Sequence, residues 1–121
     1  LKEMMFVEVA ASRRCMYCQS AHLAFCAKLG VSARTVEALL LEARSLLRAD
    51  YCALLEFVGV IKETKSQDEA LVWNVLQDDI DPEDFAETIQ MIALAEYASS
   101  LADSFKIPVD PQFHDILNVK Q

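Results

Sequence analysis

Three residues with reactive side chains follow one another at helical spacing near the start of the chain: Cys15, Cys18 and His22. At about 100° per residue in an α-helix, the three side chains share one face, each about one turn from the next. Helical residues three apart have Cα atoms about 5 to 6 Å apart, a separation that a disulfide can span. The spacing therefore suits reversible thiol–disulfide chemistry beside an imidazole that can exchange a proton.

A helix N-terminus would favour the ionised form of the first thiol. Ser12 is a candidate N-cap, which places Cys15 in the first turn, where unpaired N–H groups and the helix dipole stabilise negative charge. Arg13 and Arg14 add positive charge nearby. We therefore expect the pKa of the Cys15 thiol to fall from about 8.5 towards 7 or below, which would make it a reactive thiolate.

Zinc binding is the main alternative for thiols and an imidazole in one cluster. Along one straight helix, however, the residues from Cys15 to Cys26 span about 16 Å, too far to close a single tetrahedral site. His114, the second histidine, is isolated in the sequence. We therefore expect no metal site, and we expect Cys26 and Cys52 to be buried as small apolar residues.

The composition predicts a single all-α domain over residues 1–121. Apolar residues make up 54% of the chain, which indicates a packed core, and 121 residues suffice for one core rather than two. Two glycines and three prolines are too few for the frequent turns of an all-β fold. The apolar content is high for so small a chain, so we expect some helical faces to be buried between subunits of a homo-oligomer.

Charge and hydropathy exclude several classes of partner. With a net charge of −8, nucleic acid and anionic membranes are unfavourable partners. The chain has no run of about 18 apolar residues, so we expect no transmembrane segment. It shows no leader and starts at Leu1 rather than Met, which suggests a fragment or a processed form without upstream helices. Sparse cysteines without a leader favour a cytoplasmic location.

Apolar periodicity and capping residues predict the elements that position these side chains. Gly30 is expected to end the helix that carries the cysteines, and Ser32 to cap the next one. We expect helices over 1–11, 12–29, 32–47, 49–64 and 71–76, a loop over 77–80, and a long helix that Asp81 caps, Pro82 begins and Lys106 closes. The apolar residues expected on the buried face of the long helix are Phe85, Ile89, Ile92, Leu101 and Phe105.

The cysteine segment also carries the signature of a known family. Glu3, eleven further residues, Cys15-Met16-Tyr17-Cys18, three residues and His22 resemble the Glu-x11-Cys-x2-Cys-x3-His signature of one branch of the carboxymuconolactone decarboxylase/alkylhydroperoxidase D-like family, the peroxidase branch. The segment 24–32, with its Gly-then-Ser helix break, and the segment 81–110 are similar to later parts of the family.

Some positions depart from that family pattern. Arg13-Arg14 stands where the family commonly has Asn-Gly, and Lys106 stands where it usually has Gly. Glu96-Tyr97 replaces a frequent Phe-Asn pair. These departures leave the redox residues in place, but they leave the choice of substrate open.

The resemblance implies an all-α, alkylhydroperoxidase D-like helical bundle that forms dimers, trimers or hexamers. It implies an antioxidant enzyme, a thiol-dependent peroxidase or disulfide reductase acting on a small-molecule peroxide. Carried over by position, Cys18 attacks the peroxide, Cys15 is its disulfide partner, and His22 with Glu3 forms a proton relay. The resemblance implies no bound cofactor, but an external lipoyl-type dithiol, or a peroxiredoxin or lipoyl protein, as reaction partner. The helix end favours Cys15 as the more acidic thiol, so the order of attack stays open.

Two other functions remain as alternatives. The decarboxylase branch of the same family acts on a lactone acid without needing two thiols, and would use His22 or a nearby acid for proton transfer. A non-enzymatic helical oligomerisation module, whose cysteines only pack or sense oxidation, is the other. The pair of cysteines favours the redox branch.

Overall fold

The chain is all-α in every part that the structure describes. The structure is a computed structural model that describes residues 1–49, 51–52, 55–56, 58–59 and 82–118, and these residues contain no strand. The elements in chain order are α1 (Lys2–Ser12), α2 (Met16–Lys28), α3 (Ala33–Leu40), the 3-10 turn η1 (Arg44–Leu46), α6 (Pro82–Ser104), the 3-10 turn η2 (Pro111–Phe113) and α7 (His114–Asn118). The expectation of an all-α fold is confirmed.

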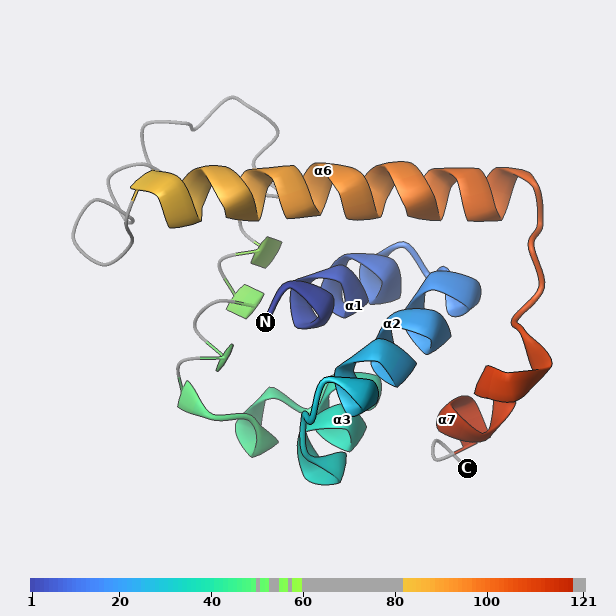
Figure 1. Cartoon of the computed structure of the whole chain (residues 1–121), viewed down its shortest axis with the longest axis horizontal. Coiled ribbons are helices and arrows are strands. Elements are labelled where there is room, and N and C mark those ends of the chain that lie inside the picture. Colours follow the sequence, from blue (N-terminus) through green and yellow to red (C-terminus); the bar gives the residue numbers. More distant parts are fainter. Residues whose placement is uncertain (50, 53–54, 57, 60–81, 119–121) are drawn as a thin grey trace.

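The long helix α6 covers one side of the molecule (Figure 1). It runs as a straight rod over α1 and the start of α2, while α3 lies at the far end of α2. The buried residues of α6 recur at intervals of four and three, which places them on one face, and most are small: Thr88, Ile92, Ala95, Ser99 and Ala102. Short side chains at this spacing let the α6 backbone approach α1 closely.

The sequence prediction of a large apolar face on α6 was wrong. Of the residues expected there, only Ile92 is buried. Leu101 is 40% exposed and Phe105 is 74% exposed. The prediction placed the largest apolar side chains on the buried face. In the structure the backbones of α6 and α1 lie close together, so that mostly small side chains fit between them.

Each of α1, α2, α3 and α6 ends in the same backbone motif. One residue after the end cap, the chain takes a left-handed conformation, and the next amide donates back into the last turn. The left-handed residues are Arg14 (φ 56°), Gly30 (φ 85°), Glu42 (φ 53°) and Lys106 (φ 51°). Glycine fits this conformation without a steric penalty, but it occupies only one of the four positions.

Most predicted boundaries hold, apart from the end of the third helix. The first helix, the break at Gly30 and the start of α6 at Pro82 are confirmed, and Ser32 caps α3 by accepting a hydrogen bond from the amide of Thr35 at 3.2 Å. The helix expected over 32–47 instead ends at Leu40, because the chain turns left-handed at Glu42. The helix expected over 71–76, the loop over 77–80 and the capping role of Asp81 lie outside the described residues.

Two buried clusters lie on opposite sides of α1, which contributes to both. The first, which we call the thiol cluster, joins α1 and the start of α2 to α6. Its buried members are Met5, Phe6, Val9, Ala10, Cys15, Cys18, Val58, Ile92, Ala95 and Ala102. The second, the aliphatic cluster, joins α1 to the later part of α2 and to α3, with buried members Met4, Val7, Leu23, Cys26, Leu39, Leu40 and Leu55.

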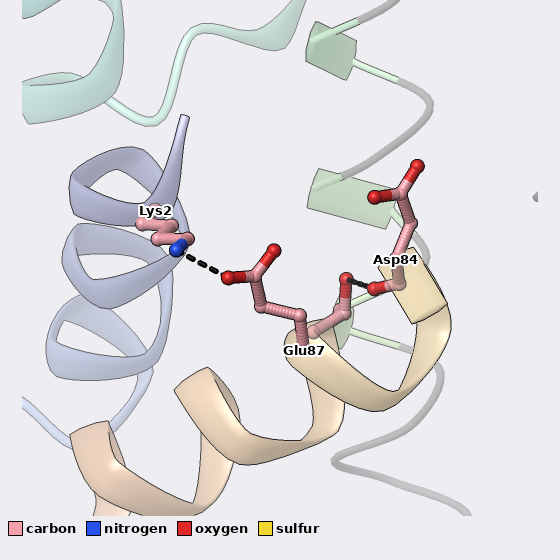
Figure 2. A network of polar contacts seen from close by, with 4 residues as sticks. Lys2, Asp84 and Glu87 are labelled. Atoms are coloured by element: carbon pink, nitrogen blue, oxygen red, sulfur yellow. Dashed lines mark hydrogen bonds and ion pairs between the residues drawn. The ribbon is translucent and has the colours of Figure 1, made fainter. Parts of the chain in front are cut away.

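A surface contact also links α1 to α6. The Lys2 ammonium and the Glu87 carboxylate form an ion pair, and on α6 the Thr88 hydroxyl donates to the Asp84 carbonyl at 2.8 Å (Figure 2). Both charged side chains are about half exposed, so the pair adds little stability and the buried stripe holds the two helices together. No helix in the described part of the chain is both long and apolar enough to cross a bilayer.

Candidate active site

The turn between α1 and α2 fixes the position of the first thiol. Ser12 is the last residue of α1, with its hydroxyl donating to the carbonyl of Val9 at 2.7 Å, so the prediction of Ser12 as the N-cap of α2 was wrong. Cys15 is the cap instead. Its amide donates to the carbonyl of Ala10 at 2.9 Å, and its Sγ accepts the amide of Cys18 at 3.4 Å. Cys15 thus closes one helix and begins the next.

Both thiols of the pair are reduced and buried. Cys15 is 1% exposed and Cys18 is 3% exposed, and neither forms a disulfide. Their surroundings differ, because Cys18 lines a cavity of about 520 Å³. A small molecule that enters this cavity meets Cys18.

The expected acidity of Cys15 is contradicted. Burial, reinforced by a hydrogen bond with the Cys18 thiol, raises the pKa of the Cys15 thiol from 9.0 to about 12. The amide of Cys18 opposes this rise, while the negative charge of Asp103 adds to it. Arg13 is not among the groups that shift this pKa; its guanidinium donates to the hydroxyl of Ser100 on α6 at 2.5 Å. Desolvation therefore outweighs the helix end.

Glu3 and His22, which are far apart in the sequence, meet between α1 and α2. His22 Nδ1–H donates to Glu3 Oε2 at 2.5 Å. Both side chains are partly buried, at 19% and 28% exposure, so the interaction is only partly screened by water. This contact fixes the neutral imidazole in the form with Nδ1 protonated, which leaves Nε2 as the nitrogen that can accept a proton.

Aromatic rings hold the imidazole in place. The Phe6 ring stacks on His22 with a centroid distance of 3.6 Å and an interplanar angle of 13°. Phe25 packs edge-on at 5.3 Å. With its Nδ1 on Glu3 as well, the ring of His22 has little freedom to turn. The sequence pattern did not single out Phe6 and Phe25, although Phe6 lies one helical turn after Glu3 and Phe25 lies three residues after His22.

The cavity is largely apolar. His22 and Cys18 lie in its wall together with side chains from α2, α6 and the C-terminal segment. Its apolar lining includes Tyr17, Ala21, Phe25, Leu94, Tyr97, Ala98, Leu101, Ala102, Ile107 and Phe113. Lys28, Asp110 and Gln112 are the longer polar groups that line it. Among the described residues no hydrogen bond joins His22 to either thiol of the pair, and His22 and Cys18 line the same cavity.

The remaining cysteines lie apart from this cavity. Cys26 is fully buried in the aliphatic cluster, as expected, and burial raises its thiol pKa to about 11. Cys52 was expected to be buried as well, but it is partly exposed and its thiol donates to Glu56 Oε1 at 3.5 Å. The structure therefore brings together Cys15 and Cys18, and brings His22 to Glu3 and to the cavity that Cys18 lines.

Comparison with known proteins identifies the family. The family model described as the carboxymuconolactone decarboxylase family matches residues 1–63, slightly more than half of the 121-residue chain. The matched segment contains Glu3, Cys15, Cys18 and His22. No curated protein and no solved structure matches the chain. The chain belongs to the carboxymuconolactone decarboxylase family.

Proposed function

We propose that this protein is a thiol-dependent peroxidase that reduces organic hydroperoxides through a disulfide cycle between Cys18 and Cys15. The family includes both decarboxylases and alkylhydroperoxidases, so membership alone does not choose between them. The observation that carries the proposal is that His22, held by Glu3 at 2.5 Å, lines the same cavity as Cys18. A positioned base and a thiol facing one cavity are the groups that peroxide reduction needs.

The proposed cycle begins with proton transfer. His22 Nε2 takes the proton of the Cys18 thiol, directly or through the molecule in the cavity, and Glu3 stabilises the imidazolium. The thiolate attacks the terminal oxygen of the hydroperoxide, so that an S–O bond forms and the O–O bond breaks. The departing alkoxide takes a proton from His22 and leaves as an alcohol. Cys18 is then a sulfenic acid.

Cys15 completes the oxidative half of the cycle. Its sulfur attacks the Cys18 sulfur, an S–S bond forms, the S–O bond breaks and water leaves. An external dithiol of the lipoyl type then reduces the disulfide by exchange, which restores both thiols and oxidises the dithiol. Burial raises the pKa of the Cys15 thiol, which disfavours Cys15 as the first attacking thiolate, so we assign the first attack to Cys18. In the resolving step the Cys15 proton leaves with the sulfenic oxygen as water.

The cavity favours an organic hydroperoxide over hydrogen peroxide. Its wall is mostly aliphatic and aromatic, and its volume of about 520 Å³ exceeds what a two-oxygen molecule needs. Apolar residues of α6 that line the cavity, Leu94 and Tyr97, are also 52% and 65% exposed. Such exposure is consistent with the homo-oligomer expected from the sequence, which light scattering of the purified protein tests.

The proposed function is tested by hydroperoxide consumption with dihydrolipoamide as reductant. We expect cumene hydroperoxide to be consumed faster than hydrogen peroxide, and the activity to fall to the background rate in both Cys18→Ser and Cys15→Ser. Cys26→Ala is the matched control, because its thiol lies on the same helix but away from the cavity, and it should retain activity. Unchanged activity in both serine variants would rule out the cycle.

The decarboxylase activity of the family is the second candidate. The Glu3–His22 pair can transfer a proton without any thiol, and the raised pKa of Cys15 means that this thiol is not itself poised to react. Lactone decarboxylation that survives complete alkylation of the cysteines, together with an absence of hydroperoxide consumption, would favour this candidate.

A further inference from the structure

Two buried polar side-chain atoms of the described residues have no hydrogen-bond partner, and they lie on α2 and α6, two helices that contribute to the thiol cluster. They are Nε2 of Gln19 on α2 and Oγ of Ser99 on α6. Gln19 is 2% exposed and Ser99 is 0% exposed. A buried donor without a partner destabilises the folded state, so each of these two groups needs a physical explanation.

The placement of Ser99 directs it towards the sulfurs. On α6 it lies four residues after Ala95 and three before Ala102, on the stripe that faces α1 and the start of α2. Ala95 and Ala102 pack into the same thiol cluster as Cys15 and Cys18. The next residue, Ser100, is tied to Arg13 in the turn that leads into Cys15. The Ser99 hydroxyl thus lies at the level of the thiol pair.

Gln19 approaches the same pair from its own helix. It lies four residues after Cys15, and its amide donates to the Cys15 carbonyl at 2.9 Å. Long side chains of an α-helix lean towards the preceding turn, which here is the turn that Cys15 caps. In the reduced protein, neither donor forms a hydrogen bond to a sulfur of the pair.

We propose that the Ser99 hydroxyl and the Gln19 amide donate hydrogen bonds to the negatively charged and oxygenated forms of the Cys15–Cys18 sulfurs. A neutral thiol is a weak acceptor, whereas a thiolate, and the oxygen that a peroxide leaves on a sulfur, are stronger ones. The sulfenic oxygen also extends the group by one bond, towards donors that the bare sulfur does not reach. This inference rests on the proposed function only for the oxygenated form.

Hydrogen-bond donors near the sulfurs would stabilise a thiolate that its other surroundings disfavour. Burial, the Cys18 thiol and the Asp103 carboxylate all disfavour the thiolate form of Cys15. The backbone amide of Cys18 favours it. Neutral donors held in the core can stabilise the anion without a second buried charge.

The experiment compares Ser99→Ala with wild type by two readouts. The first is the pH dependence of iodoacetamide alkylation at Cys15 and Cys18, followed by peptide mass spectrometry. Losing one hydrogen bond to a charged sulfur should slow alkylation about tenfold at neutral pH and move the profile up by about one pH unit. The second is dimedone trapping of the sulfenic acid after one equivalent of cumene hydroperoxide in Cys15→Ser, where the Ser99→Ala change should lower the yield.

Two further variants make the test specific. Gln19→Met removes the second donor at similar volume and should slow alkylation in the same direction. Ser100→Ala, which removes the neighbouring hydroxyl, should leave the profile unchanged. Ser99→Ala deletes a hydroxyl that has no partner in the reduced protein, so its thermal midpoint should equal or exceed that of wild type.

The outcomes separate this inference from the proposed function. Alkylation profiles of Ser99→Ala and Gln19→Met that match wild type would overturn the inference, even in a protein that consumes hydroperoxide. An equal shift in Ser100→Ala would overturn it too, because the effect would then not be specific. A shifted alkylation profile in a protein that does not consume hydroperoxide would support the donor role towards the thiolate and reject the peroxidase function.

Discussion

The thiol cluster and the aliphatic cluster share α1 and α2 but are built from different side chains. Around Cys15 and Cys18, α6 contributes mainly small residues, and one wall opens into the cavity. Around Cys26, long aliphatic side chains from three helices fill the space. One helix therefore carries thiols in two environments. The helix that packs against a cysteine, rather than the cysteine itself, therefore decides whether its thiol borders a cavity.

The largest expected effect lies at the edge of the thiol cluster. Glu3→Gln keeps a hydrogen-bond acceptor for His22 but removes the charge that stabilises the imidazolium, so hydroperoxide turnover should fall about a hundredfold. The measurement is kcat/KM for cumene hydroperoxide across pH. Glu8→Gln, on the same helix, is the control and should stay near wild type. Equal losses in the two variants would contradict the relay.

Core substitutions of opposite kinds should destabilise the two clusters: loss of a large side chain in the aliphatic cluster, and gain of one in the thiol cluster. Leu23→Ala opens a cavity in the aliphatic cluster and should lower the free energy of unfolding by about 3 kcal/mol. Ala95→Leu overfills the small-residue stripe and should lower it by about 2 kcal/mol, while Ala93→Leu, on the exposed side of α6, should change little. Urea unfolding measures all three. Wild-type stability in Ala95→Leu would show that α6 is not closely packed on α1.

Alkaline pH should lower the free energy of unfolding through a buried thiol in each cluster. The pKa values of Cys15 and Cys26 are raised on folding from 9.0 to about 12 and about 11, so the folded state holds protons that the unfolded state releases. The free energy of unfolding should therefore fall as pH rises above 9, by about 1.4 kcal/mol per pH unit for each thiol. In Cys26→Ala the fall between pH 9 and 11 should be about half as steep. An unchanged slope would show that burial does not raise the pKa of the Cys26 thiol.

The smallest effect concerns the turn that leads into the thiol cluster. Arg14 has a φ of 56°, a conformation that costs a side-chain-bearing residue about 1 kcal/mol relative to glycine. Arg14→Gly should therefore raise the free energy of unfolding by up to about 1 kcal/mol, and Gly30→Ala, at the matching turn towards the aliphatic cluster, should lower it by a similar amount. Chemical denaturation measures both. A destabilised Arg14→Gly would indicate that the arginine side chain contributes more than its backbone costs.

The sequence predicted the local features of the site better than the long-range ones. Cys15, Cys18 and His22 were found because their spacing predicts that they lie about one helical turn apart; in the structure Cys15 caps the helix that carries the other two. The pairing of Glu3 with His22 came from the family resemblance, since no local pattern reports which residues of two packed helices touch. The acidity of Cys15 was mispredicted because a sequence shows the helix end but not the depth of burial.

The arrangement of α6 was the main structural feature that periodicity did not predict. Small residues such as Ala95 and Ser99 carry a weak hydrophobic signal, yet they are the ones that fit where two backbones come close. Larger residues such as Phe105 gave the stronger signal and are exposed. The left-handed turn at Arg14 was not predicted either, because an arginine gives no indication of a left-handed backbone.

The Cys15 sulfur accepts the amide of Cys18 and so caps the helix that carries Cys18. Losing or gaining electrons at this sulfur changes how well it accepts that amide. In the proposed disulfide cycle, oxidation of the pair would therefore also change the stability of the first turn of α2, because the reacting sulfur is the atom that caps it.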